Sequence, residues 1–537
     1  MDSKTLEEIK KAKPLTIVPI VRSLDISLDA VDYFSKISDY GRKKDCLLLE
    51  SADFIDKYGE LSIGTASPCL KIVGKGQNFE IKSLNELGTK ILPILKKELL
   101  FCDKISLKKD SLSGTLKPQR KSVSEEDRLN LKTHIDIIRK IAFLFKPTEK
   151  PFVPYCGLFG AISYDFIDQF EDLPANKDDI LKEPDYELYF LDNLFIYEHR
   201  TGKLNLIANA IILGNKDAVL KRCNRILDGY EKALELPSPK KKSFKHAKQN
   251  VSRDISQEEY EEIVEKLKKN ILQGDIFQAV PSRTIISNYN SEPLDIYSHL
   301  RKLNPSPYMF YINSGNGILL GSSPEMAIRV QDSNDNPNEK IVEIRPIAGT
   351  KPRGISDGKI NLDLDSRYET ELKTDEKELA EHAMLVDLAR NDIARISKPN
   401  TRYVDKPFFI EKYSHVQHIV SNVRGILRDD LDALHAYLAS MNMGTLTGAP
   451  KVMAMKLLRE YEQTRRGFYG GSVCYITPSG DFDSAIIIRT IRIKNNLAYI
   501  RSGAGIVYDS VPKNEFHETE KKAEACLRAI KLAGGVR

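Results

Sequence analysis

GGSVCYITPSGDFDSAIIIRTIRIKNNLAYIRSGAG, residues 470–505, is the stretch that decides the fold class of this chain. It contains three apolar runs, near Gly470–Ile476, Ala485–Ile493 and Leu497–Ile500, which are separated by the turn-forming residues 477–481 and 494–496. Short connections of this kind join antiparallel strands. The stretch therefore predicts a mostly antiparallel sheet near the C-terminal end of the chain.

Helices and further strands surround this sheet in the sequence. Ser256 and Glu259 have the spacing of a capping box, and apolar residues then follow the helical period up to Gly274. A second helix is predicted over roughly Thr374–Ile393, and a last one from near Ser510 to Gly534-Gly535. Strands are expected between the first two helices, at 308–312, 317–320, 326–330 and 341–347.

The chain divides at a Pro- and Lys-rich stretch that begins at Leu236. We interpret residues 236–253 as a linker between an N-terminal region, residues 1–235, and a second region, residues 254–531. The polar stretch 103–127 predicts a surface loop.

Composition excludes several classes of protein. The chain has 537 residues, 41% of them hydrophobic and 29% charged, as in soluble globular proteins. Its seven cysteines show no CxxC pairing, which favours reduced thiols and a cytoplasmic location. We see no signal peptide at the N-terminus and no apolar run near the roughly 20 residues of a membrane span.

Nucleic-acid binding is the alternative from a different functional class. Lys240–Lys242 and the basic residues within 390–398 would carry it, but the net charge is only +5. No basic stripe with interleaved aromatic residues is present. The composition therefore predicts no nucleic-acid partner.

Four glutamates form the most informative polar pattern. Glu378/Glu381 and Glu515/Glu518 are two i,i+3 pairs on separate predicted helices, so each pair lies on one helical face. A single pair is also typical of a solvated face. Two matched pairs can instead enclose a hard cation, and oxygen-only ligands suit Mg²⁺.

Several residues nearby have the chemistry of an anion site. Backbone N–H groups at Gly349 and Thr350, and in the turn 502–505, can hold a carboxylate, although a strand end with surface charge also fits the first pair. Arg489 stands inside an apolar run and needs an anionic partner there. Tyr469 precedes Gly470-Gly471, where a ligand can approach closely.

Five motifs in order resemble the chorismate-utilising enzymes: residues 343–354, 387–392, 444–451, 502–507 and 518–523. The resemblance covers about residues 255–531 and implies that family's fold, an α+β (α/β sandwich) fold of largely antiparallel sheets packed face to face with helices outside. Residues 48–51 and 157–165 are similar to the anthranilate-forming branch of the family.

Two positions separate the branches of this family. Gln278 stands where water-activating members have a lysine base, and Ala348 stands where the aminodeoxychorismate-forming branch has a nucleophilic lysine. Both differences favour Mg²⁺-dependent amination of chorismate at C2 and elimination of pyruvate to give anthranilate, the first step of tryptophan synthesis. Aminodeoxychorismate formation, in the folate pathway, is the alternative.

The resemblance also implies roles for individual residues. Glu381 and Glu518 would hold Mg²⁺, with Glu378 and Glu515 accepting from its waters. Glu325 would be the general acid, and His418, structural in isolation, would act in elimination beside Gln278. The implied chorismate-binding residues are Gly349, Thr350, Tyr469, Arg489, Gly503, Ala504 and Gly505.

Two partners are implied as well. None of the cysteines lies in the Gly-x-Cys-x-Gly turn of a class-I glutaminase, so a separate glutamine amidotransferase subunit, and hence a hetero-oligomer, is expected. L-tryptophan is expected as a feedback inhibitor, although Ser51 alone is more typical of a strand-end hydroxyl. The residues implied to bind the inhibitor are Glu50, Ser51, Pro307, Tyr308 and Met309.

Overall fold

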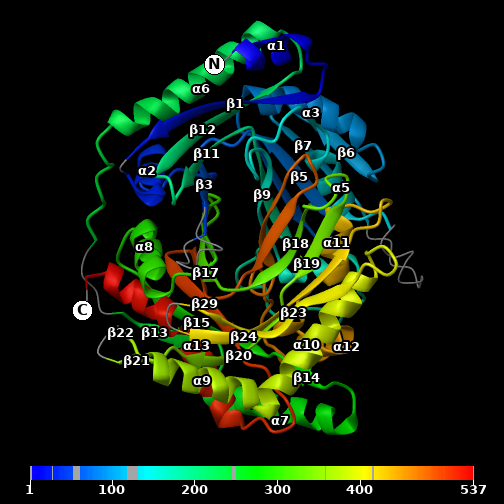
Figure 1. The fold of residues 1–537 in the computed structure, drawn as a ribbon, viewed down its shortest axis with the longest axis vertical. Helices are drawn as coiled ribbons and strands as arrows, with labels where there is room; N and C mark the ends of the chain where they lie inside the picture. Colours follow the sequence, from blue (N-terminus) through cyan, green and yellow to red (C-terminus); the bar gives the residue numbers. More distant parts are fainter. Residues whose placement is uncertain are drawn as a thin grey trace.

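Two large sheets face each other and form the body of the molecule (Figure 1). The structure, a computed structural model, describes residues 3–26, 28–51, 61–117, 131–244, 249–356, 359–413 and 416–535. Residues 118–127 of the predicted loop, residues 245–248 of the predicted linker and His415 lie outside them. Every strand pair in the two sheets is antiparallel except β1 with β8, among the residues described.

The first sheet has twelve strands. In spatial order these are β13 (Val251–Arg253), β15 (Ser282–Asn288), β29 (Leu497–Gly503), β28 (Thr490–Lys494), β17 (Ile318–Ser323), β16 (Tyr308–Asn313), β2 (Cys46–Glu50), β3 (Leu61–Thr65), β11 (Asn193–Glu198), β12 (Lys203–Ile211), β1 (Thr16–Asp25) and β8 (Lys146–Pro147).

The second sheet has thirteen strands. In order these are β20 (Ile347–Pro352), β24 (Val416–Ile426), β19 (Lys340–Ile344), β18 (Met326–Asp332), β27 (Phe482–Ile486), β26 (Ser472–Ile476), β9 (Gly157–Ile162), β10 (Tyr186–Leu191), β4 (Leu70–Lys75), β5 (Asn78–Ser83), β7 (Ser111–Thr115) and β6 (Lys104–Leu107), with β23 (Tyr403–Lys412) beside β24. Two short ribbons pair β14 (Gln278–Ala279) with β25 (Gly448–Ala449) and β21 (Ile355–Ser356) with β22 (Lys359–Ile360).

Helices cover the outer faces of both sheets (Figure 1). The first sheet packs against α1 (Ser3–Lys11), α2 (Ala30–Ile37), α6 (Lys216–Glu235), α8 (Pro293–Leu303) and α13 (Pro512–Ala533). The second packs against α3 (Glu86–Glu98), α5 (His134–Ala142), α10 (Glu376–Ala394) and α11 (Ala433–Ser440). The remaining helices are α7 (Gln257–Gln273), α9 (Leu362–Thr374) and α12 (Lys451–Tyr461), with 3-10 turns η1 (Tyr164–Gln169) and η2 (Gly444–Leu446).

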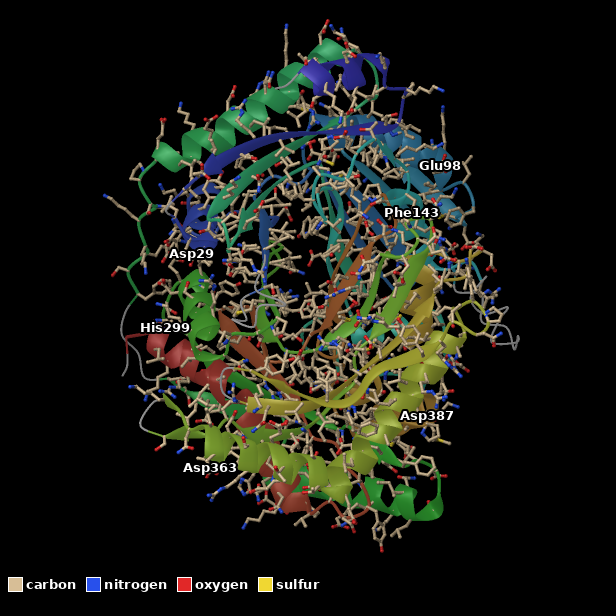
Figure 2. All side chains as sticks on the ribbon, viewed as in Figure 1. Asp29, Glu98, Phe143, His299, Asp363 and Asp387 are labelled. Carbon is tan, nitrogen blue, oxygen red and sulfur yellow. The ribbon has the colours of Figure 1, made fainter. Side chains whose placement is uncertain are left out.

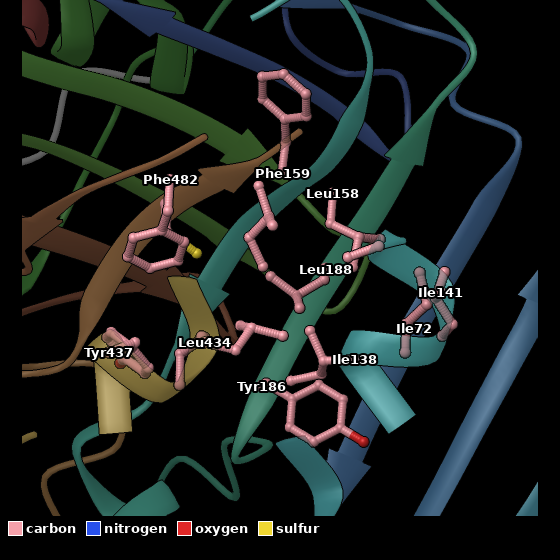
Figure 3. Close-up of a cluster of buried hydrophobic side chains, with 14 of the residues drawn as sticks. Ile72, Ile138, Ile141, Leu158, Phe159, Tyr186, Leu188, Leu434, Tyr437 and Phe482 are labelled. Atoms are coloured by element: carbon pink, nitrogen blue, oxygen red, sulfur yellow. The ribbon is translucent and has the colours of Figure 1, made fainter. Parts of the chain in front are cut away.

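Alternation along the strands produces this layering. Leu47 of β2 belongs to the core that the two sheets share, and the next residue, Leu48, belongs to the core under the outer helices. Figure 3 shows packing of outer helices on the second sheet, where Ile138 and Ile141 of α5 and Leu434 of α11 belong to the same cluster of buried residues as the strands. The predicted sandwich of antiparallel sheets with outer helices is confirmed.

The N-terminal and C-terminal regions contribute strands to both sheets. Strand β2 pairs with β16, where Leu48 is opposite Tyr311, and β9 pairs with β26, where Phe159 is opposite Tyr475. The sheets therefore run continuously across the two predicted regions.

The helix ends follow the sequence signals. Ser256 and Glu259 make both hydrogen bonds of the capping box, at 3.2 and 2.7 Å, and Gly274 ends α7 with φ +83°. Pro512 lies in the first turn of α13, and Gly534 follows its end. No helix in the described part of the chain has both the length and the apolar character needed to span a membrane.

Two local predictions were wrong and one helix was missed. The stretch 485–493 is not one strand, because β27 and β28 belong to different sheets and the chain crosses between them at residues 487–489. The first part of the predicted loop 103–127 is the hairpin β6–β7 at a sheet edge. A charged helix that the sequence analysis missed, α9, precedes α10.

Candidate active site

A single cavity of about 550 Å³ gathers nearly all of the residues predicted to bind substrate or metal or to act in catalysis. Strands β14, β20, β24 and β29 and helices α10 and α13 contribute to its wall. The predicted residues that line it are Gln278, Glu325, Gly349, Thr350, Glu378, Glu381, His418, Tyr469, Arg489, Gly503, Gly505, Glu515 and Glu518. Ala504 is fully buried behind this wall.

Two neighbouring crossings between the sheets bring Glu325 and Arg489 to the cavity. Glu325 lies between β17 and β18, and Arg489 lies between β27 and β28. Because β17 is next to β28 and β18 is next to β27, the chain changes sheets twice at the same level. The Ile486 N–H donates to the Glu325 carbonyl at 3.0 Å, which ties the two crossings together.

The crossing at Arg489 requires an unusual backbone. Its φ is +50°, a left-handed conformation that side chains other than glycine rarely adopt. Such residues persist where the surrounding structure holds them, and they cluster at functional sites. The strain at this position directs a cation into the cavity.

Glu325 has the properties of an acid that keeps its proton in part at neutral pH, where an ordinary carboxyl is fully ionised. It is 9% exposed, and burial raises the pKa of its carboxyl to about 7. The cations Lys522 and Arg489 act in the opposite direction, without cancelling the effect of burial. A carboxyl of this kind can donate a proton at neutral pH.

Arg489 is a cation without an anionic partner. Its guanidinium makes no hydrogen bond or ion pair with any of the residues that the structure describes, and burial lowers its pKa. Other buried arginines of the chain are paired, as Arg492 is with Glu183 at 2.7 Å. An unpaired guanidinium in a cavity is suited to bind a carboxylate of a ligand.

The four glutamates face the same cavity from two helices. Burial raises the pKa values of Glu378, Glu381 and Glu515, and the neighbouring carboxylates add to this effect in all three. The Gln278 amide donates to Glu381 at 3.2 Å, and Lys522 pairs with Glu518 at 2.6 Å. The helices therefore bring four carboxylates to one cavity, where burial and mutual repulsion disfavour the charged forms of Glu378, Glu381 and Glu515.

These carboxylates fit a magnesium ion. Within the described residues, no group of three or more acidic, histidine or cysteine side chains is close enough to enclose a metal by itself. Mg²⁺ does not need such a cage, because it commonly keeps several waters and binds one or two carboxylates plus the substrate. Glu381 and Glu518, one from each helix, satisfy this requirement.

His418 is held as a neutral base. Its Nδ1 lies 2.9 Å from the Gly349 carbonyl and 3.0 Å from the Thr350 hydroxyl. Since a carbonyl only accepts, we assign the proton to Nδ1, which leaves Nε2 with a free lone pair. Burial lowers the pKa of the ring, so the neutral form is favoured.

Two glycines allow the backbone to form the cavity wall. Gly349 has φ +65°, and a Cβ there would lie 2.9 Å from Leu372 and 3.1 Å from the Glu378 carboxylate. A Cβ at Gly505 would lie 2.7 Å from the Gln278 amide nitrogen. Any larger residue would displace a side chain that we assign to the site.

Some residues of the site were missed from sequence. Lys377, Lys521, Lys522 and Thr445 also line the cavity. Lys522 carried a usable signal, because it follows Glu518 by four residues, the spacing of a helical ion pair. The other three adjoin or lie within stretches that the sequence analysis singled out, but no spacing marked them individually: Lys377 is beside Glu378, Thr445 is within 444–451 and Lys521 is within 518–523.

A second cavity, of about 230 Å³, contains all of the residues predicted to bind the inhibitor. Glu50, Ser51, Pro307, Tyr308 and Met309 line it together with residues of the second sheet. The Glu50 carboxylate accepts from the Ser62 and Tyr297 hydroxyls at 2.8 and 2.5 Å. On the opposite wall, Arg329 pairs with Asp483 at 3.2 Å.

The fold and this site define a class of enzyme. The sequence profile described as chorismate binding enzyme matches residues 106–528, and the chain belongs to that family. The protein called anthranilate synthase component 1 in Vibrio cholerae is 40% identical over 98% of this chain and 98% of its own length. A Buchnera aphidicola protein of the same name is 40% identical over 97% of this chain and 99% of its own.

Solved structures agree with this assignment. The crystal structure of anthranilate synthase component I from Streptococcus pneumoniae matches with a TM-score of 0.67 and 29% identity, over 87% of this chain and 92% of that one. The menaquinone-specific isochorismate synthase of Escherichia coli matches with a TM-score of 0.64 over 98% of both chains. At 15% identity, the latter shows that the fold is shared.

Proposed function

We propose that this chain is the synthase component of an anthranilate synthase, which aminates chorismate at C2 and then eliminates pyruvate. The observation that carries the proposal is the meeting of a protonated acid, a neutral base and an unpaired guanidinium in one cavity, at Glu325, His418 and Arg489. These are the groups needed to expel a hydroxyl, remove a ring proton and hold a dicarboxylate.

Chorismate would be bound by a side-chain cation and by backbone N–H groups. Arg489 receives one carboxylate of chorismate, and Gly349 and Gly503 line the same space, where their backbone N–H groups would bind the other. Glu381 and Glu518 hold Mg²⁺, with Glu378 and Glu515 accepting from its waters. A Mg²⁺ ion bound by these residues would supply positive charge next to the ring carboxylate and would draw electron density from the diene.

Proton transfer is assigned to two residues that line the cavity. In the first step ammonia forms a bond to C2, and the C4 hydroxyl leaves as water with the proton of Glu325. In the second step His418 Nε2 takes the C2 proton and the bond between ring carbon C3 and the ether oxygen breaks. The ring becomes aromatic, and the released enolpyruvate takes up a proton at its methylene carbon to give pyruvate. The lowered pKa of His418 and the raised pKa of Glu325 agree with these roles.

Gln278 and Ala348 favour this reaction over those of other branches. The Gln278 amide donates to Glu381 and cannot act as a base on water. Ala348 has no amine with which to attack the ring. Aminodeoxychorismate formation remains the alternative for a member of this family.

Partners and control complete the proposal. Ammonia comes from glutamine through an amidotransferase subunit, in a cytoplasmic hetero-oligomer. L-tryptophan inhibits from the second cavity, where its ammonium and carboxylate can meet Glu50 and Arg329. Such a ligand inhibits only if it binds two states of the chain with different affinities.

A fluorescence assay tests the proposal. The purified chain is incubated with chorismate, Mg²⁺ and ammonium at alkaline pH, with and without tryptophan, and with a chelator as the control. Anthranilate fluorescence should appear, and both tryptophan and the chelator should suppress it. Aminodeoxychorismate without anthranilate would refute the assignment.

A further inference from the structure

The residue that follows each proposed metal ligand is polar and fully buried. His382 comes directly after Glu381 on α10, and Thr519 comes directly after Glu518 on α13. Both side chains are 0% exposed, and both lie outside the lining of the catalytic cavity. Successive residues of a helix are about 100° apart, so each of these side chains is on a different side of its helix from the glutamate. The two helices that carry the proposed metal ligands therefore share one arrangement.

Two side chains of the first sheet bind Thr519. The Arg283 Nε–H donates to the Thr519 hydroxyl at 2.8 Å, and the Ser502 hydroxyl donates to the Thr519 carbonyl at 2.8 Å. Arg283 of β15 and Ser502 of β29 are directly opposite each other in the pairing of these strands. The Thr519 hydroxyl in turn donates to the Phe516 carbonyl at 2.7 Å. One residue of α13 is thus held from two neighbouring strands.

Arg283 occupies a position where a guanidinium is costly to bury. It is 0% exposed, and its Nη1 has no hydrogen-bond partner among the described residues. Its ion-pair partner Glu520 is also paired with Arg253, at 2.9 Å. A buried ion pair often stabilises a fold no more than apolar residues of the same volume would, but its hydrogen bonds have direction. Arg283 is therefore suited to fix the rotation of α13 about its axis.

A buried hydrogen bond holds α10 on the second sheet in the same way. His382 Nε2 lies 2.7 Å from the Ser421 hydroxyl of β24, which also accepts from the Phe408 N–H at 2.9 Å. The His382 ring packs edge-on against Phe408, with ring centroids 5.0 Å apart. Asp387, on the same helix, is exposed on the outside of the molecule (Figure 2). The His382 side of α10 is therefore the side that is fixed to the sheet.

These contacts fix the two metal ligands relative to different sheets. Glu381 is fixed relative to β24, which carries His418, and Glu518 is fixed relative to β15 and β29, the latter ending in the turn 502–505. Mg²⁺ demands near-ideal octahedral geometry with ligands at about 2.0–2.1 Å. An oxygen roughly 5 Å from a helix axis moves by about 2 Å when the helix rotates by about 20°. A rotation of that size would take a glutamate out of contact with the ion.

We propose that Thr519 and His382 are positioning residues, which set the rotation of α13 and α10 and with it the distance between Glu518 and Glu381. The proposal rests on the magnesium site of the proposed function. It concerns residues outside the cavity that receives the substrate and the ion, and these residues act only through the helices that carry the glutamates.

Two substitutions at Thr519 separate its hydrogen bonds from its packing. Thr519→Val removes the hydroxyl and keeps the volume, whereas Thr519→Ser keeps the hydroxyl and removes a methyl group. The probe is Mg²⁺ alone, titrated into the full chain by calorimetry without chorismate, so the measurement does not depend on turnover. The Kd for Mg²⁺ should rise about tenfold or more in Thr519→Val and less than about threefold in Thr519→Ser.

Kinetics and stability distinguish positioning from a purely structural role. In Thr519→Val the Mg²⁺ concentration for half-maximal ammonium-driven turnover should rise about tenfold, whereas kcat at saturating Mg²⁺ should stay within about threefold. If Thr519 were only a core residue, both substitutions would lower the urea midpoint of unfolding and leave the Kd for Mg²⁺ unchanged. That result would overturn the proposal for α13.

Arg253→Met is the matched control. Arg253 pairs with the same carboxylate as Arg283, that of Glu520, but its side chain is 39% exposed. The control variant should bind Mg²⁺ as tightly as the unmodified chain. A tenfold loss of Mg²⁺ affinity in this control would show that the charge at Glu520, and not the contact with Thr519, determines the metal site. The assignment of Thr519 would then be wrong.

His382 is tested by its own pair of substitutions. His382→Leu removes the hydrogen bond with Ser421, whereas His382→Gln keeps a polar group that can reach the same hydroxyl. The Kd for Mg²⁺ should rise about tenfold or more in the first and clearly less in the second. Normal Mg²⁺ binding in His382→Leu would overturn the proposal for α10. An unmodified chain that binds no Mg²⁺ would instead refute the metal site of the proposed function, and the positioning roles with it.

Discussion

Replacing the buried acid Glu325 with glutamine should have opposite effects on activity and stability. A carboxyl whose pKa is about 7 in place of 4.5 costs roughly 3 kcal/mol more to ionise in the folded chain than in the unfolded chain. Because the folded-state pKa is the higher one, the protonated carboxyl favours the folded chain. This stabilisation is complete below about pH 4.5 and is lost as the pH rises through about 7.

The variant Glu325→Gln removes that cost, because its amide carries no charge. At pH 8 we expect it to unfold at higher denaturant concentration than the unmodified chain, by up to roughly 3 kcal/mol, with little gain at pH 4.5. Ammonium-driven anthranilate formation should fall by roughly 10²–10⁴, the usual contribution of a general acid.

The pH profile of the unmodified chain gives a second measure of the same group. With the concentration of free ammonia held constant, turnover should fall about tenfold for each pH unit above 7, as the protonated fraction falls. Exposed Glu376→Gln is the control and should change neither property. Equal destabilisation of Glu325→Gln at pH 4.5 and pH 8, or retention of more than a tenth of the turnover, would refute this reasoning.

Three other substitutions test separate parts of the proposal. Glu381→Gln should abolish Mg²⁺-dependent turnover and weaken Mg²⁺ binding, measured by calorimetry, at least about tenfold. Its circular dichroism spectrum should be unchanged. Near-normal activity would show that Glu381 is not part of the metal site. His418→Met removes the Nε2 base, so aminodeoxyisochorismate, the product of the amination step, should accumulate and be detected by chromatography. Equal slowing of both steps would count against this role. Ser51→Phe places a ring in the 230 Å³ cavity and should raise the tryptophan concentration needed for inhibition about tenfold or more. Uninhibited turnover should change little. Unaltered inhibition would discredit that cavity as the regulatory site.

Local signals in the sequence were sufficient for the helices near the site. The capping box at Ser256 and the punctuation by Pro512 and Gly534 depend on residues a few positions apart, and the structure confirms all of them. Local spacing was also sufficient for the glutamate pairs, since residues at i and i+3 lie on the same face of a helix.

The change of sheets at Arg489 could not be predicted in this way. Residues 485–491 form an apolar run with one arginine and no glycine or proline, so nothing local marks the break. The left-handed φ of Arg489 is imposed by the pairing of β28 with β17 and of β27 with β18, strands that are more than 150 residues apart in sequence. Only the tertiary structure contains that information.

The prediction that these residues form one site depended on the resemblance to a known family more than on residue spacing. Glu325 lies in a short turn whose residues show no periodicity, and its raised pKa results from burial by distant segments. Lys377 is next to Glu378 and Thr445 lies within the motif 444–451, but both were missed because no spacing shows which side chains of those stretches reach the cavity.

The exchange of strands between the two ends of the chain has a consequence for how the protein acquires its structure. Strand β2 cannot pair with β16, and β9 cannot pair with β26, until the C-terminal region has been synthesised. Strand β26 follows β9 by about 300 residues. A nascent chain that stops at Leu236 therefore exposes unpaired edges in both layers, so we expect slow maturation and dependence on chaperones. Fragments cut at that point should recover function only when they are refolded together.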